Sequence, residues 1–136
     1  MEEEARRIGG AEMITLALPF PISTNAIWRS GRNPKTGKVC TFRQKRYLSW
    51  RNAASGFFYE QGGNRLPKIT GHFRAHIVLS EKHRGNKDAD NFCKVPLDFL
   101  QFVGLVANDK LCDRTVVEWG HVEAPAGCIV TLSPVE

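Results

Sequence analysis

The sequence has no long apolar run. No stretch approaches the roughly 20 consecutive apolar residues that a membrane-spanning helix needs, and charged residues recur throughout the 136 positions. The first residues include Glu2, Glu3 and Glu4 and lack the apolar core of a secretory signal peptide. We therefore expect a cytoplasmic protein with no membrane partner.

The sequence also lacks the cysteine spacing of a zinc site. It has four cysteines, and none of them forms a Cys-x-x-Cys pair or has a histidine at zinc-like spacing. They are Cys40, Cys93, Cys112 and Cys128. We expect reduced thiols and no structural zinc.

Acidic residues are absent between Glu12 and Glu60, although eight cations fall in that interval. These cations are Arg29, Arg32, Lys35, Lys38, Arg43, Lys45, Arg46 and Arg51. Such a run produces a local positive field that suits phosphates, and the formal net charge is +5. A solvated basic surface is the alternative. Four aromatic residues (Trp28, Phe42, Tyr47 and Trp50) lie in the same interval; they either stack on nucleic-acid bases or belong to the core.

Periodicity and turn residues predict one small α+β domain. Residues 1–11 read as a flexible leader that ends in Gly9-Gly10, and residues 12–136 as a single domain. The predicted elements are an edge-type strand over 13–18, a loop from 31 to 41, a helix over 44–61, a strand over 69–79, a helix over 92–103, and strands over 115–122 and 128–132. This order predicts a small mixed sheet of about four strands, flanked by two main helices.

A pair of carboxylates, Asp88 and Asp90, precedes the second helix. Pro96 would cost about 3 kcal/mol in a helix interior, so we expect the regular helix to begin near Lys94 or Val95 and the carboxylates to lie before it in a non-helical segment. Residues two apart share one side of an extended segment, and like charges placed together need a cation between them. Oxygen ligands of this kind suit Mg²⁺ or Mn²⁺. A calcium loop is excluded, since its required glycine and glutamate are absent.

Asp109 is a third candidate ligand. The helix over 95–104 spans about 15 Å, and the next five residues can retrace about 16 Å if extended, so Asp109 can return toward Asp88 and Asp90. Lys94 lies four residues after Asp90. It either stabilises charge on a scissile phosphate or forms an ordinary helix pair worth about 0.3–0.5 kcal/mol.

Two separated motifs resemble those of one known family. The first is Pro19-x-Pro21-x-Ser23-x-Asn25-x-x-Trp28-Arg29. The second is Asp88-x-Asp90-Asn91-x-x-Lys94 with Asp98, followed by Asp109 nineteen residues after Asp90. In this order they are similar to the motifs of the RusA-type Holliday-junction resolvases, over about residues 13–132. Asn108 departs from the pattern, because family members often carry an acidic residue there.

The resemblance implies a RusA-like homodimer that cuts paired strands of a four-way DNA junction with Mg²⁺, or Mn²⁺ in its place, in recombination and repair. It makes Asp88, Asp90 and Asp109 the metal ligands and Lys94 a further catalytic residue. We expect DNA contacts from Asn25, Arg29, Arg32, Lys35, Lys38, Arg43, Lys45, Arg46 and Lys87, although Asn25 could instead cap a turn. Two alternatives stay open: a metal-dependent nuclease for other branched or single-stranded DNA, and a DNA-binding protein without activity.

Overall fold

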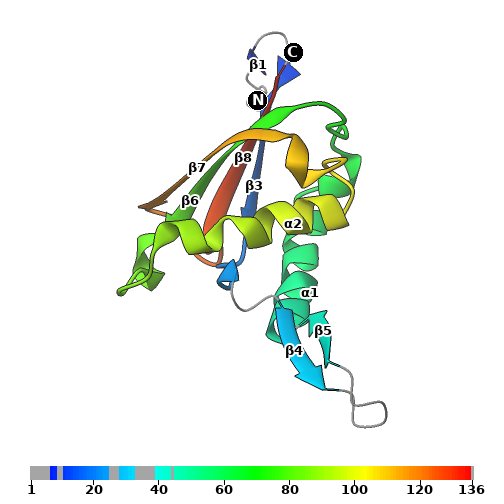
Figure 1. The fold of residues 1–136 in the computed structure, drawn as a ribbon. Coiled ribbons are helices and arrows are strands. Elements are labelled where there is room, and N and C mark those ends of the chain that lie inside the picture. The colour runs from blue at the N-terminus through cyan, green and yellow to red at the C-terminus, as the bar shows by residue number, and fades with distance from the viewer. Residues whose placement is uncertain (1–6, 9–10, 25–27, 33–38, 44, 136) are drawn as a thin grey trace.

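The protein is built on a four-stranded mixed sheet with two main helices (Figure 1). This computed structural model describes residues 7–8, 11–24, 28–32, 39–43 and 45–135. The strand order is β3 (Ile14–Leu18), β8 (Cys128–Pro134), β6 (Phe73–Ser80) and β7 (Cys112–Gly120). Only the β6–β7 pair is parallel. The predicted α+β class is confirmed.

Strand β6 shows why the sheet forms. Phe73, Ala75 and Ile77 are buried, whereas Arg74 and His76 between them are exposed. This period-two alternation fixes one face of the sheet against the core.

The parallel pairing of β6 and β7 requires a crossover between them. Helix α2 (Lys94–Phe102) supplies it and lies across the sheet in Figure 1.

Helix α1 (Lys45–Glu60) begins and ends within one residue of the predicted range, 44–61. Gly62 follows it with a φ of 75°, and Gly104 follows α2 with a φ of 83°. Both glycines adopt the left-handed conformation that commonly ends helices. The apolar side of α1 carries Tyr47 and Trp50, which are buried in the core, so these two rings are not available to stack on bases. The prediction that α2 begins near Lys94 or Val95 is confirmed, because the helix begins at Lys94. The predicted edge position of β3 is confirmed as well.

Two short hairpins were not predicted. Strands β4 (Trp28–Arg32) and β5 (Val39–Arg43) pair where the sequence predicts a loop. Strands β1 (Arg7–Ile8) and β2 (Ala11–Glu12) pair at the end of the segment over 1–11 that we predicted to be a flexible leader. Backbone hydrogen bonds hold such ladders together, so they need no alternation of apolar residues.

Within the described ranges, no helix is long and apolar enough to cross a membrane.

Candidate functional site

The two sequence motifs meet in the folded chain. The hydroxyl of Thr24 donates a hydrogen bond to the backbone oxygen of Asn91 at 3.1 Å, across 67 positions of sequence. The rings of Phe20 and Phe92 lie 5.3 Å apart between centroids. The segment over residues 20–24 therefore packs against residues 88–92, which we call the carboxylate loop. This segment belongs to the first motif, so part of that motif lies beside the candidate site.

Asp88 and Asp90 are not arranged as the sequence predicts. Asp88 has extended backbone angles, but Asp90 lies in a 3-10 helix, η4 (Ala89–Phe92). The backbone N–H of Asn91 donates to the backbone oxygen of Asp88 at 3.2 Å and closes this turn. Successive residues of a 3-10 helix are rotated by about 120°, so the two carboxylates do not repeat on one side. Our expectation of an extended segment is wrong here, because Asp and Asn favour local turns. Both aspartates are exposed.

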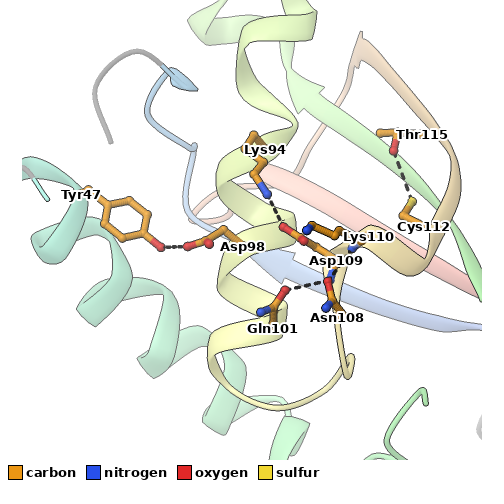
Figure 2. A network of polar contacts seen from close by, with 9 residues as sticks. All are labelled: Tyr47, Lys94, Asp98, Gln101, Asn108, Asp109, Lys110, Cys112 and Thr115. Carbon is orange, nitrogen blue, oxygen red and sulfur yellow. Dashed lines mark hydrogen bonds and ion pairs between the residues drawn. The ribbon is translucent and has the colours of Figure 1, made fainter. Parts of the chain in front are cut away.

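Asp109 returns to α2, as its spacing allows. Its carboxylate forms an ion pair with Lys94, the first residue of the helix (Figure 2). The Asp109 side chain is only 13% exposed. Its backbone N–H donates to the side-chain oxygen of Gln101 at 2.8 Å. Asn108 caps the short turn η5 (Asp109–Leu111) by accepting from the N–H of Lys110 at 2.9 Å. Asp109 thus lies along the flank of α2, between contacts to its first and last turns.

The three aspartates match a hard dication in the kind of ligand they offer, but they are not gathered around one point. Among the residues that the structure describes, which include all three, no group of three or more Asp, Glu, His or Cys side chains is placed to hold a metal ion. The cation that Asp109 binds here is the ammonium group of Lys94.

Cys93 lies between the carboxylate loop (residues 88–92) and Lys94. Its thiol donates to the backbone oxygen of Asp90 at 3.4 Å. Burial raises the pKa of the Cys93 thiol, the negative charge of Asp90 raises it further, and Lys94 opposes both. Cys93 therefore stays protonated at neutral pH and adds no charge beside Asp90.

Asp98 has a different neighbour from Asp109. Its carboxylate accepts a hydrogen bond from the hydroxyl of Tyr47, which is fully buried on α1 (Figure 2). The bond joins α1 to α2 beneath the surface. This contact supports a structural role for Asp98.

The predicted DNA contacts fall into three groups. Lys45, Arg46 and Lys87 are exposed, and the ammonium of Lys87 donates to the backbone oxygen of His83 at 2.9 Å. Positions 29, 32 and 43 lie in β4 and β5, where only the backbone is described. Asn25, Lys35 and Lys38 lie outside the described residues.

Sequence reasoning missed a basic loop beside the site. Lys82 and Arg84 are exposed between β6 and Asp88. The loop is held by Phe20, whose ring lies 4.6 Å from that of His83, and by Trp119, whose ring lies 5.8 Å from the Arg84 guanidinium carbon. Neither contact has a local sequence signal, because each joins segments far apart in the chain.

The role of Gln101 was also missed, since its bond to Asp109 spans eight positions and follows no motif. Asn108 could have been recognised, because asparagine directly before a turn is a preferred cap.

A scan against protein-family models finds no match for this chain, and a search of curated proteins finds none either.

Proposed function

We propose that this protein is a Mg²⁺-dependent endodeoxyribonuclease that resolves Holliday junctions and related branched DNA by hydrolysing paired phosphodiester bonds. The observation that carries the proposal is the ion pair between Lys94 and Asp109. It joins two residues of the carboxylate motif that lie fifteen positions apart. The packing of Thr24 and Phe20 on the carboxylate loop supports the same site, because it adds the other motif.

Asp88, Asp90 and Asp109 would hold the dication, which supplies an activated water and screens the phosphate charge when bound. Lys94 would have a distinct role. Its side chain is 49% exposed. Its ammonium would therefore be able to contact a phosphate oxygen when Asp109 binds the dication instead of Lys94. A positive group fixed near developing negative charge stabilises the transition state.

The exposed cations support a DNA partner. Lys45, Arg46 and Lys87 were expected to contact DNA, and Lys82 and Arg84 extend the set beside the carboxylate loop. A footprint of about 6–10 phosphates predicts that affinity falls by about 10³–10⁵ between about 50 and 200 mM salt. A flat salt response in a filter-binding titration would contradict this surface.

The deciding experiment uses a synthetic four-way junction, with and without Mg²⁺. We expect symmetric cuts that need the metal, and we expect Asp90→Asn to bind the junction normally and not cut it. Asp113→Asn is the matched control, because Asp113 is an exposed carboxylate that hydrogen-bonds His72 at 2.7 Å on the sheet. Cutting by Asp90→Asn, or no cutting by the wild-type protein, would reject the proposal.

One observation favours a second candidate. Because the three carboxylates are not gathered, the chain could be a DNA-binding protein without nuclease activity. Salt-sensitive junction binding with no cutting in Mg²⁺ or Mn²⁺ would support this candidate. Three-way, linear and single-stranded substrates in the same gel separate a resolvase from a nuclease for other DNA. We place the protein in the cytoplasm of a bacterial or phage-infected cell, as part of this proposal.

A further inference from the structure

The face of the sheet that points away from α2 carries an open cavity. Arg74 and His76 reach this face from β6, because they alternate with the buried residues of that strand. The cavity has a volume of about 330 Å³ and is lined by Arg74, Ala75, His76, Arg114, Val116 and Ser133. Small-molecule sites commonly have volumes of about 300–1,000 Å³, so this cavity suits a small ligand.

Two arginines and a serine form one row across three strands of this face. Arg74 of β6 aligns with Arg114 of β7 on one side and with Ser133 of β8 on the other. Adjacent strands lie about 4.8 Å apart, and like charges directly beside each other are unfavourable in a sheet. Among the described residues, no carboxylate forms an ion pair with either guanidinium group. The row therefore brings two positive charges and a hydroxyl together without a carboxylate of the described chain to balance them.

A shift in strand register places the two arginines side by side. Phe73 aligns with Cys112. The next residue, Arg74, aligns with Arg114, so the register shifts by one residue and passes over Asp113. An unshifted register would align Arg74 with Asp113, which has the opposite charge. The thiol of Cys112 donates to the backbone oxygen of Arg114 at 3.3 Å and stabilises the shifted backbone. Irregularities of this kind commonly re-aim a side chain beside a site, so the fold favours two aligned cations over an available charge pair.

The carboxylates closest along β7 are bound to histidines. Asp113 hydrogen-bonds the Nδ1 atom of His72 at 2.7 Å, and Glu118 hydrogen-bonds the Nε2 atom of His76 at 2.5 Å. The second bond also orients the imidazole ring at the wall of the cavity. Both guanidinium groups are therefore available to an anion from solution.

We propose that this cavity binds a phosphate dianion, either as the free ion or as the terminal phosphate of an ester. A phosphomonoester carries a charge of about −1.5 to −2 at neutral pH, which matches the two guanidinium groups of Arg74 and Arg114. Each guanidinium offers paired N–H donors that fit two phosphate oxygens, and the Ser133 hydroxyl adds a further donor. A backbone phosphodiester of DNA carries a single negative charge and fits less well. The site goes beyond the proposed function, because it uses none of the residues assigned to DNA cutting.

The test is a titration of the full ¹⁵N-labelled chain with methyl phosphate, followed by NMR at about pH 8, where this ligand is a dianion. We expect saturable amide shifts at Arg74, Arg114 and Ser133 that sodium chloride of equal ionic strength does not reproduce. Dimethyl phosphate, a diester, should bind about tenfold more weakly or worse, because it loses one charge-assisted contact. Inorganic phosphate distinguishes the two sources: tighter binding than methyl phosphate identifies the free ion as the ligand, and weaker binding identifies an ester.

Arginine variants locate the site. Arg74→Gln and Arg114→Gln should each weaken binding of methyl phosphate by about tenfold, and the double variant should show no saturation. Arg65→Gln is the matched control, because it makes the same change at an exposed arginine outside the cavity. We expect its affinity to equal that of the wild-type protein.

Thermal denaturation separates ligand binding from a role in folding. Without phosphate, Arg114→Gln should melt no lower than the wild-type protein, because the like-charge contact with Arg74 is relieved. Methyl phosphate should raise the melting temperature of the wild-type protein and of Arg65→Gln, since a ligand stabilises the state that it binds. It should not raise that of either cavity variant.

Three results would overturn the proposal: no saturable shifts in the wild-type protein, equal affinity for methyl and dimethyl phosphate, or folded cavity variants that bind like the wild-type protein. These measurements use neither DNA nor a divalent metal, so their outcome is independent of cutting on the junction.

Discussion

Asp109 is bound to Lys94 through its carboxylate, although fifteen positions of sequence separate the two residues. The contact exists because η5 turns the chain back along α2, and because Gln101 holds the backbone of Asp109 against the helix. The carboxylate is mostly covered, whereas the ammonium is half exposed. The Lys94 ammonium is therefore the more accessible charge of this pair.

Asp109→Asn should therefore separate activity from stability. An ion pair with one exposed partner contributes about 0–1 kcal/mol, so we expect the free energy of unfolding to fall by no more than about 1 kcal/mol while junction cutting is lost. Urea denaturation and a single-turnover nicking assay measure the two effects. A loss of stability of several kcal/mol, or nicking at the wild-type rate, would show that the pair is structural.

Gln101→Ala should change the metal requirement without unfolding the protein. Gln101 is an exposed residue whose side chain positions the Asp109 backbone. Substitution of a residue that orients a metal ligand commonly weakens metal affinity by about 10–100-fold. We expect the Mg²⁺ concentration for half-maximal cutting to rise about tenfold. Gln101→Glu keeps an acceptor oxygen and should restore most of the affinity. An unchanged Mg²⁺ titration for Gln101→Ala would remove Gln101 from the site.

Tyr47→Phe should destabilise the contact between the two helices. The hydroxyl of Tyr47 donates to Asp98 in a part-buried setting, and loss of a partner for such a group costs about 1–3 kcal/mol. Tyr59→Phe is the control, because Tyr59 is on the same helix and 55% exposed. We expect urea denaturation to show a shift for Tyr47→Phe only. Equal stabilities for the two variants would contradict a structural role for this bond.

A pair of glycine substitutions should have opposite effects. A methyl group at Gly127 would lie 2.1 Å from the backbone nitrogen of Phe20, which must then shift. Since Phe20 packs on the carboxylate loop, Gly127→Ala should reduce both stability, by about 1–3 kcal/mol, and cutting. Gly56→Ala adds a methyl group with no atom within 4 Å on an exposed part of α1, and should stabilise by about 0.5–1 kcal/mol. Thermal denaturation compares them. Equal melting temperatures would show that the Phe20 contact is loose.

The sequence by itself determined the parts of this protein that depend on near neighbours. The alternation along β6 placed its core face, and Gly62 and Gly104 marked the helix ends. Pro96 placed the start of α2 near Lys94 or Val95, and the helix begins at Lys94. These signals are local, because a residue's backbone preference and the repeat of apolar positions act within a few residues. The α+β class follows from the order of such elements.

Only the tertiary structure decided how the candidate site is assembled. The packing of Phe20 on His83, the bond from Asp109 to Gln101 and the parallel pairing of β6 with β7 each depend on segments that meet only after folding. The turn at Asp90 overrode the extended geometry that the sequence favoured, because a single backbone hydrogen bond to Asp88 sufficed to close it. Long-range contacts leave no spacing rule in the sequence, so the separation of the three carboxylates could not be predicted from it.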